Sequence, residues 1–227
     1  MQPGRQRIAR VCGLGGRPGG GQRDAQGVSV FIVPKSAKGV TTRDYPTVDG
    51  FRASEVTFEN VALGADALIG SEGAALPLVE KVIDEAIVAT CAEACGVFRR
   101  LHEGTLEYTK QRKQFGQPIS QFQVLQHRMV DMFIQLEQSI SMTYMADIKL
   151  ADSDVERAKG AAAAKVQIGK AAKFIGQNAI QLHGGMGMTD EMAIGHYFKR
   201  ATMIENAFGS TDHHLARYEG LSLGKAA

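Results

Sequence analysis

Hydrophobic positions recur every three to four residues from about residue 73 almost to the C-terminus, the spacing of one buried helix face. A first helix is expected over residues 73–112, with a buried face formed by Leu76, Val79, Val82 or Ile83, Ala86, Ala89 or Thr90, Ala94, Val97 and Leu101. A second places together Leu125, Met129, Met132, Leu136, Ile140 and Thr143. Long helices joined by short loops predict an antiparallel four-helix-type bundle.

The remaining helices are shorter or richer in alanine. A third run covers residues 155–182 and stops at Gly184 and Gly185, since paired glycines end helices. Two short helices are expected near residues 191–200 and 212–221. The bundle is therefore expected to occupy residues 71–227.

A different pattern precedes the helices. Residues 28–33 are β-branched and end at Pro34, and residues 53–58 alternate polar with apolar side chains, so both predict short strands. A sheet of so few strands is only marginally stable by itself, so we expect these strands to belong to a sheet that is completed elsewhere. The fold class is mainly α, with a short β remnant over residues 25–70. Residues 1–24, with seven glycines and five arginines, are expected to be disordered or irregular.

Composition excludes several classes of protein. The chain has 227 residues, of which 44% are hydrophobic and 22% charged, as in soluble globular proteins. A formal charge of +2 is too balanced to indicate a nucleic-acid partner. No apolar run approaches the ~18 to 20 residues of a membrane span. Only three cysteines occur and no secretory signal is evident, which favours a cytoplasmic setting.

The most specific stretch runs from Tyr108 to Gln123, YTKQRKQFGQPISQFQ. Arg112 at a helix end, followed by Phe115-Gly116, places a cation and an aromatic face beside a sharp turn. Such an edge can hold a phosphate through the guanidinium group and a flat ring by stacking. On spacing alone, the favoured alternative is that Arg112 complements the helix dipole and Phe115 fills the core.

This stretch resembles the C-terminal domain of the acyl-CoA dehydrogenase family, whose signature reads Tyr-x-x-x-Arg-x-x-Phe-Gly-x-Pro-Ile-x-x-x-Gln. A second family motif follows at residues 181–187, QLHGGMG. The resemblance extends over about residues 27–221, and residues 25–70 look like the end of the family's middle β domain. The family's N-terminal domain has no counterpart here, so we expect either a truncated chain or a natural short subunit.

The resemblance implies an FAD-dependent α,β-dehydrogenation of an acyl-CoA thioester. It implies that Arg112, Phe115 and Gln123 contact the adenosine diphosphate part of FAD. The same part of FAD would be contacted from the neighbouring subunit by Gln181, Gly184 and Gly185. FAD would then sit at the subunit interface of a homo- or hetero-oligomer, a dimer or tetramer. Thr211 matches a family threonine that faces the flavin, although Ser210 or Thr211 is also an ordinary helix N-cap.

The chain departs from the family at the catalytic loop. Many members read Tyr-Glu-Gly-Thr there, with Glu as the base, whereas this chain has Phe-Gly-Ser-Thr and Gly209 at the base position. Other members carry the base on the first helix of the bundle. Counting back from Phe115 without gaps places Ala86 at that position. Glu85 is therefore the candidate base only if a bulge in the helix or a local gap in the alignment brings its side chain to the base position. The alternative for Asp84 and Glu85 is a solvated helix face.

Three interpretations remain open: an acyl-CoA dehydrogenase or a fragment of one, a non-catalytic FAD-binding subunit of a heteromeric member, and a fragment of a related flavin monooxygenase or nitroalkane oxidase. No metal site is expected. His213 and His214 are adjacent and point in different directions, and no Glu-x-x-His pair occurs.

Overall fold

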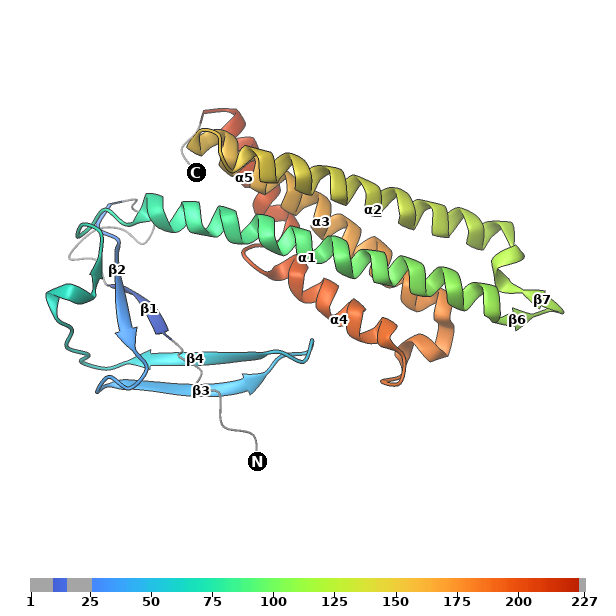
Figure 1. The fold of residues 1–227 in the computed structure, drawn as a ribbon, viewed down its shortest axis with the longest axis horizontal. Helices are drawn as coiled ribbons and strands as arrows, with labels where there is room; N and C mark the ends of the chain where they lie inside the picture. The colour runs from blue at the N-terminus through green and yellow to red at the C-terminus, as the bar shows by residue number, and fades with distance from the viewer. Residues whose placement is uncertain (1–9, 16–25, 225–227) are drawn as a thin grey trace. The chain divides into compact units, whose positions relative to one another are not determined.

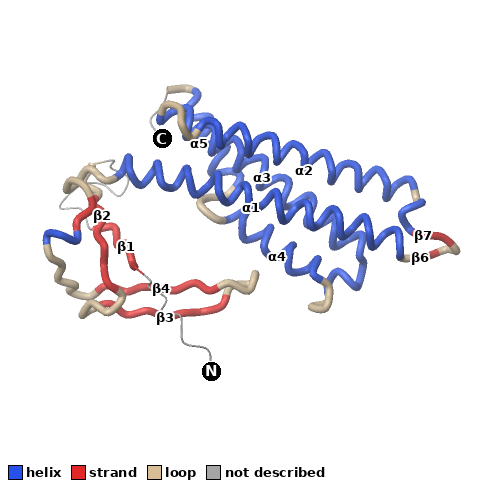
Figure 2. The backbone as a smooth tube through the Cα atoms, in the orientation of Figure 1, coloured by secondary structure: helices blue, strands red, loops and turns tan. Residues whose placement is uncertain are grey.

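The computed structural model describes residues 10–15 and 26–224, and helices account for most of them (Figure 1, Figure 2). The predicted mainly α fold class is confirmed. The chain divides between Glu80 and Lys81 into two compact units, each with its own internal packing. Within the described ranges, no helix combines the length and the apolar character needed to cross a membrane.

The first unit holds two small antiparallel sheets. Its elements are β1 (Arg10–Gly15), β2 (Ser29–Pro34), β3 (Val40–Pro46), β4 (Arg52–Phe58), the 3₁₀ helix η1 (Ala65–Ala67) and β5 (Leu68–Ile69). β2 pairs with β1 along one edge and with β5 along the other, while β3 and β4 form a separate hairpin. The strands expected over residues 28–33 and 53–58 are confirmed as β2 and β4. β3 escaped prediction because polar residues dominate it, and the Arg43–Glu55 ion pair at 2.8 Å links it to β4.

β1 lies inside the segment that we expected to be disordered or irregular. Its register with β2 runs from Arg10↔Pro34 to Gly15↔Ser29. The ladder is made by backbone groups, so a glycine-rich sequence with little β propensity can still pair with a neighbouring strand. The structure therefore differs from the expectation at β1, while residues 1–9 and 16–24 lie outside the described residues.

The second unit is the helical bundle. Its elements are α1 (Leu76–Gln111, from Lys81 onward in this unit), β6 (Lys113–Gln114), β7 (Gln117–Pro118), η2 (Ile119–Gln121), α2 (Gln123–Lys149), α3 (Asp154–His183), η3 (Gly184–Met188), α4 (Ala193–Asn206) and α5 (Thr211–Ser222). α1, α2 and α3 run in alternating directions, and α3 packs against α2, α4 and α5 (Figure 1). The helices expected over residues 73–112, 155–182 and 212–221 are confirmed as α1, α3 and α5. The one expected near residues 191–200 is α4, which extends further toward the C-terminus.

The buried face of α1 differs from the predicted one in its first half. Val82 and Ile83 are 54% and 36% exposed, whereas Ile87 is fully buried. Further along, Ala94 and Leu101 are fully buried, as predicted. The reason is Asp84, which lies on the buried face and interrupts the apolar stripe that the sequence pattern follows.

Asp84 is the centre of a buried ionic cluster, and the expectation of a solvated helix face is wrong for it. Its two carboxylate oxygens lie 2.7 Å from Arg217 Nη1 of α5 and 3.4 Å from Arg157 Nε of α3. The Asp84 side chain is 1% exposed. A buried carboxylate is tolerated when cations neutralise it, as Arg157 and Arg217 do here. Because Asp84 lies on α1 and the two arginines on α3 and α5, the cluster links three helices at one end of the bundle.

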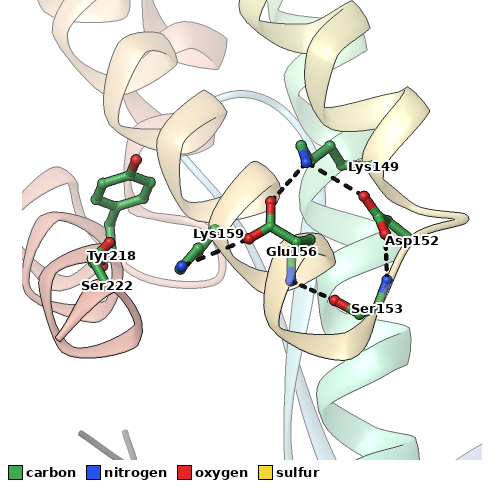
Figure 3. Close-up of polar contacts among 7 residues, drawn as sticks. All are labelled: Lys149, Asp152, Ser153, Glu156, Lys159, Tyr218 and Ser222. Atoms are coloured by element: carbon green, nitrogen blue, oxygen red, sulfur yellow. Dashed lines mark hydrogen bonds and ion pairs between the residues drawn. The ribbon is translucent and has the colours of Figure 1, made fainter. Parts of the chain in front are cut away.

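The turn between α2 and α3 is closed by charged side chains (Figure 3). Lys149 Nζ lies 2.7 Å from Glu156 and 3.4 Å from Asp152. Ser153 caps α3 by accepting a hydrogen bond from the Glu156 N–H at 3.4 Å. Acidic residues in the first turn of α3 also complement the helix dipole, so the start of α3 is stabilised by both its cap and its charges.

Candidate functional site

The motif residues meet around a cavity of about 540 Å³ at one end of the bundle. We call it the Arg112 cavity. It is lined by Tyr108, Arg112, Gln114, Ile119, Leu125, Arg128 and the six residues 181–186. These residues come from the end of α1, the β6–β7 hairpin, η2, the start of α2, the end of α3 and the 3₁₀ helix η3. Its size is that of a pocket for a small molecule or cofactor.

Two glycines at the end of α3 keep the floor of the Arg112 cavity open. Gly184 ends the helix with φ of 60°, a left-handed conformation that favours glycine. A Cβ atom added at Gly184 or Gly185 would meet nothing within 4 Å. A Cβ at Gly187, by contrast, would lie 2.9 Å from the Ile180 carbonyl oxygen. Gly184 and Gly185 therefore leave their backbone open to the cavity, whereas Gly187 is a glycine because a larger residue would not fit against Ile180.

These glycines give a matched stability prediction. We expect Gly187→Ala to lower the free energy of unfolding by about 1 to 3 kcal/mol, because the methyl group is forced against the Ile180 backbone. Gly185→Ala should leave it within about 0.5 kcal/mol, since the added methyl enters open space. Urea unfolding of the two variants beside the wild type measures both values. Equal loss in both variants would contradict the packing difference.

The charge of the Arg112 cavity suits an anion. It is lined by two guanidinium groups, Arg112 and Arg128, and none of the described lining residues is acidic. α3 contributes its C-terminal end, which carries partial negative charge, so attraction for a phosphate comes from the arginines rather than from a helix dipole. Arg128 was missed by the sequence analysis. It lies three residues after Leu125, one turn along the same face of α2, and that spacing was the available signal.

Tyr108 and His183 form a rigid wall of the Arg112 cavity. Their rings stack with centroids 4.3 Å apart, and Tyr108 Oη donates to the His183 carbonyl at 3.3 Å. His183 Nδ1 lies 2.8 Å from the Ala179 carbonyl oxygen, so Nδ1 carries the proton and donates. Burial lowers the pKa of His183, which keeps its ring neutral.

Not every predicted cofactor residue lines this cavity. Phe115 stands at the tip of the β6–β7 hairpin with φ of 54° and is 91% exposed, so it does not fill the core. Its ring makes an edge contact with Phe122, with centroids 6.1 Å apart. Gln123 is exposed at the first position of α2. Both lie on the segment that joins α1 to α2, beside the cavity rather than in its lining.

The structure brings the two motifs together. Arg112, Gln181, Gly184 and Gly185 line one cavity of the chain. The assignment of these residues to particular subunits stays a prediction from the resemblance. The signature after α1 and the glycine motif after α3 are adjacent because both helices end at the same end of the bundle (Figure 1).

Thr211 belongs to a second cavity, of about 480 Å³, which we call the Thr211 cavity. Thr211 is the first residue of α5, and its Oγ1 donates to Glu205 at 3.2 Å. The N-cap is Ser210, which accepts from the His213 N–H at 3.4 Å. Gly169 of α3 lies beneath Thr211, where a Cβ would collide with the threonine hydroxyl. The Thr211 cavity and the Arg112 cavity share no lining residue, so they are distinct cavities, although their linings come within one turn of each other at Gln177 and Gln181.

The two candidate positions for a catalytic base lie in different surroundings. Gly209 has φ of 111°, and a Cβ there would lie 2.6 Å from His213 Cδ2 and 3.1 Å from His214 Nε2. The loop in this conformation has no room for a carboxylate side chain at Gly209. Glu85 lies on the exposed side of α1, next to the buried Asp84. Exposure leaves Glu85 free to face a substrate or another chain.

Stability should fall on acidification because of buried histidines. Burial lowers the pKa of His214 to about 4, against about 6.5 in an unfolded chain. The unfolded state then binds the proton more tightly. The free energy of unfolding is therefore highest above about pH 6.5 and decreases as the pH falls toward 4. The loss approaches about 3 kcal/mol. Urea unfolding between pH 4 and 7 measures this loss of stability. The control variant His127→Gln, at an exposed histidine, should show the same loss as the wild type. A free energy of unfolding that does not change over this pH range would contradict the prediction.

Comparison with known proteins identifies the domain. The family model described as acyl-CoA dehydrogenase, C-terminal domain, matches residues 76–218. The human mitochondrial short-chain specific acyl-CoA dehydrogenase is 28% identical over 190 residues, covering 82% of this chain and 46% of that protein. The short-chain specific enzyme of Clostridium acetobutylicum is 29% identical over 193 residues, covering 84% and 51%.

Solved structures agree on the fold. Butyryl-CoA dehydrogenase from Megasphaera elsdenii superposes with a TM-score of 0.81 at 24% identity, over 90% of this chain and 54% of that chain. The chain thus spans about half the length of the relatives that it matches. With the family model matching most of the bundle, the chain belongs to the acyl-CoA dehydrogenase family through its C-terminal domain.

Proposed function

We propose that this chain supplies FAD-binding surface to a flavin-dependent acyl-CoA dehydrogenase, and that the adenosine diphosphate part of FAD binds in the Arg112 cavity. The observation that carries the proposal is the meeting of Arg112, Arg128 and the open Gly184–Gly185 floor in one cavity of about 540 Å³. Guanidinium groups pair with a diphosphate through charge-assisted hydrogen bonds. The glycine floor lets the diphosphate approach the backbone.

The positions of the two cavities support a cofactor shared between subunits. The Arg112 cavity and the Thr211 cavity lie at different places along α3. In a homo- or hetero-oligomer, the Arg112 cavity of one subunit would hold the diphosphate end while Thr211 of another faces the flavin. Phe115, exposed at the hairpin tip, supplies an aromatic face for stacking at the same interface.

The proposed reaction is α,β-dehydrogenation of an acyl-CoA thioester. Bound FAD supplies the acceptor for the hydride that leaves the β-carbon. A base removes the α-proton, which the thioester acidifies, and Glu85 is the candidate in this chain. It is a carboxylate on the exposed side of α1, so it needs no change in the bundle to meet a substrate.

A second candidate function is that of a non-catalytic FAD-binding subunit in a heteromeric dehydrogenase. Gly209 favours it, because the loop position used by many family members has no side chain and no space for one. In that arrangement the base comes from the partner chain, and Glu85 is dispensable. The two candidates share the Arg112 cavity and differ only in where the base resides.

Co-expression with a full-length homologue tests the proposal. We expect a complex that retains flavin absorbance, and Arg112→Ala should reduce the flavin retained by about tenfold or more through loss of charge-assisted bonds. Arg100→Ala is the matched control, since Arg100 is an exposed arginine of α1 outside the cavity lining. A complex without flavin, or equal retention in both variants, refutes FAD binding here. Acyl-CoA dehydrogenation that survives Glu85→Gln favours the non-catalytic subunit.

A further inference from the structure

Lys165 of α3 is fully buried and binds the end of α4 and the loop that follows it. Its Nζ donates to the carbonyl oxygens of Ile204 at 2.9 Å, Glu205 at 2.8 Å and Gly209 at 3.1 Å. These three bonds use all three donors of the ammonium group. Ile204 and Glu205 lie in the last turn of α4, where carbonyl groups lack a partner within the helix, so Lys165 caps α4 with a favourable charge.

His214 of α5 holds the same loop at the neighbouring residue. It is 1% exposed, and its Nε2 lies 2.9 Å from the Phe208 carbonyl oxygen. A carbonyl only accepts, so Nε2 carries the proton and donates. His214 Nδ1 is then a bare acceptor, buried and without a hydrogen-bond partner in the described part of the chain. The ring is held neutral and in one tautomer.

The loop that these two side chains hold has an uncommon backbone. Phe208 and Gly209 have φ of 58° and 111°, both in the left-handed region, and Phe208 is not a glycine. Such conformations persist when the surroundings over-determine them. The carbonyl groups of these same two residues are the ones bound by His214 and Lys165. The loop is therefore fixed at both of its left-handed residues.

This loop sets the position of Thr211. Ser210 and Thr211 follow Gly209 directly, and Thr211 lines the Thr211 cavity together with Glu205, whose own carbonyl group is held by Lys165. We propose that Lys165 and His214 are positioning residues that hold the Phe208–Gly209 loop and so place Thr211 toward the flavin. The inference rests on the proposed function only for the identity of the group that Thr211 faces.

Hydrogen exchange of the full chain tests the positioning role without any cofactor. Lys165→Met removes three bonds and keeps an apolar stem, and His214→Leu removes one. In both we expect peptides covering residues 204–212 to exchange at least about tenfold faster than in the wild type, with α2 unchanged. Ile175→Ala is the control, since it deletes a fully buried side chain of α3 elsewhere in the core.

The exchange rates test whether Lys165 and His214 hold the Phe208–Gly209 loop. If residues 204–212 exchange no faster in Lys165→Met than in Ile175→Ala, relative to α2, the proposal is overturned. Should Lys165→Met fail to fold, His214→Leu decides by the same criterion, because it removes one bond and leaves the Lys165 contacts in place.

A second arm uses the flavin-bearing complex with a full-length homologue. Lys165→Met should leave the affinity for ADP within about twofold of the wild type, because Gln181, the first α3 residue of the Arg112 cavity, lies about 24 Å from Lys165 along α3. It should change the visible absorption band of the bound flavin, and Ile175→Ala should not. An unchanged band overturns the positioning role. Failure of the wild-type chain to bind ADP refutes the proposed function instead, and leaves the exchange result standing.

Discussion

Asp84→Asn should lower the free energy of unfolding by about 3 to 5 kcal/mol, which is the cost of breaking a buried ion pair on one side. The substitution leaves the guanidinium groups of Arg157 and Arg217 without the carboxylate that neutralises them, at side-chain exposures of 7% and 16%. Part of the charge on Arg157 stays paired with Asp154, so the larger loss is expected at Arg217. Chemical unfolding at neutral pH measures the change.

Glu85→Gln is the matched control for Asp84→Asn. It removes the neighbouring carboxylate of the same helix, which is exposed, and should change stability by no more than about 0.5 kcal/mol. The double variant Asp84→Asn with Arg217→Met should recover part of the loss, because an apolar side chain replaces the unpaired cation. Equal effects of Asp84→Asn and Glu85→Gln would refute the buried cluster.

Gly209→Glu, the change that restores a carboxylate to the loop, should destabilise the chain by about 2 to 5 kcal/mol. Two causes add: φ of 111° is unfavourable for any residue with a Cβ, and that Cβ would lie 2.6 Å from the ring of His213. We therefore expect no recovery of a loop base. Thermal and urea unfolding of the variant, with dehydrogenation measured in the complex, check both statements.

Gly116→Ala separates the two causes. Gly116 has φ of 81°, and an added Cβ would have no atom within 4 Å. Gly116→Ala should therefore lower the free energy of unfolding only through the unfavourable backbone conformation, by about 1 to 2 kcal/mol. If Gly209→Glu costs no more than Gly116→Ala, the packing of His213 against Gly209 is not a constraint. Dehydrogenase activity gained through Gly209→Glu would show that the loop accepts a base.

The sequence predicted the helices well because each buries a stripe of apolar residues with a regular period. It failed where a polar side chain is buried. Asp84 lies on the stripe of α1, and periodicity assigns a charged residue to solvent. Lys165 is buried because its partners lie on α4 and the following loop, about 40 residues along the chain, and His214 is buried against the carbonyl of Phe208 in that same loop. No local pattern reports such contacts.

The candidate site was predictable to the extent that motifs carry it. Arg112 and the glycines of residues 184–185 were found by their signatures, and the structure brings them into one cavity. Their meeting in one cavity depends on α1 and α3 ending at the same end of the bundle, which the motifs do not encode. Arg128 was missed because an arginine one turn into a helix has many ordinary roles.

Titration of ADP into the full chain by calorimetry tests the central claim most directly, since ADP is the part of FAD assigned to the Arg112 cavity. The account predicts that the wild type and Arg100→Ala bind ADP with equal affinity and that Arg112→Ala binds it about tenfold or more weakly. Absence of ADP binding by the wild type, or equal binding by Arg112→Ala, would contradict the account.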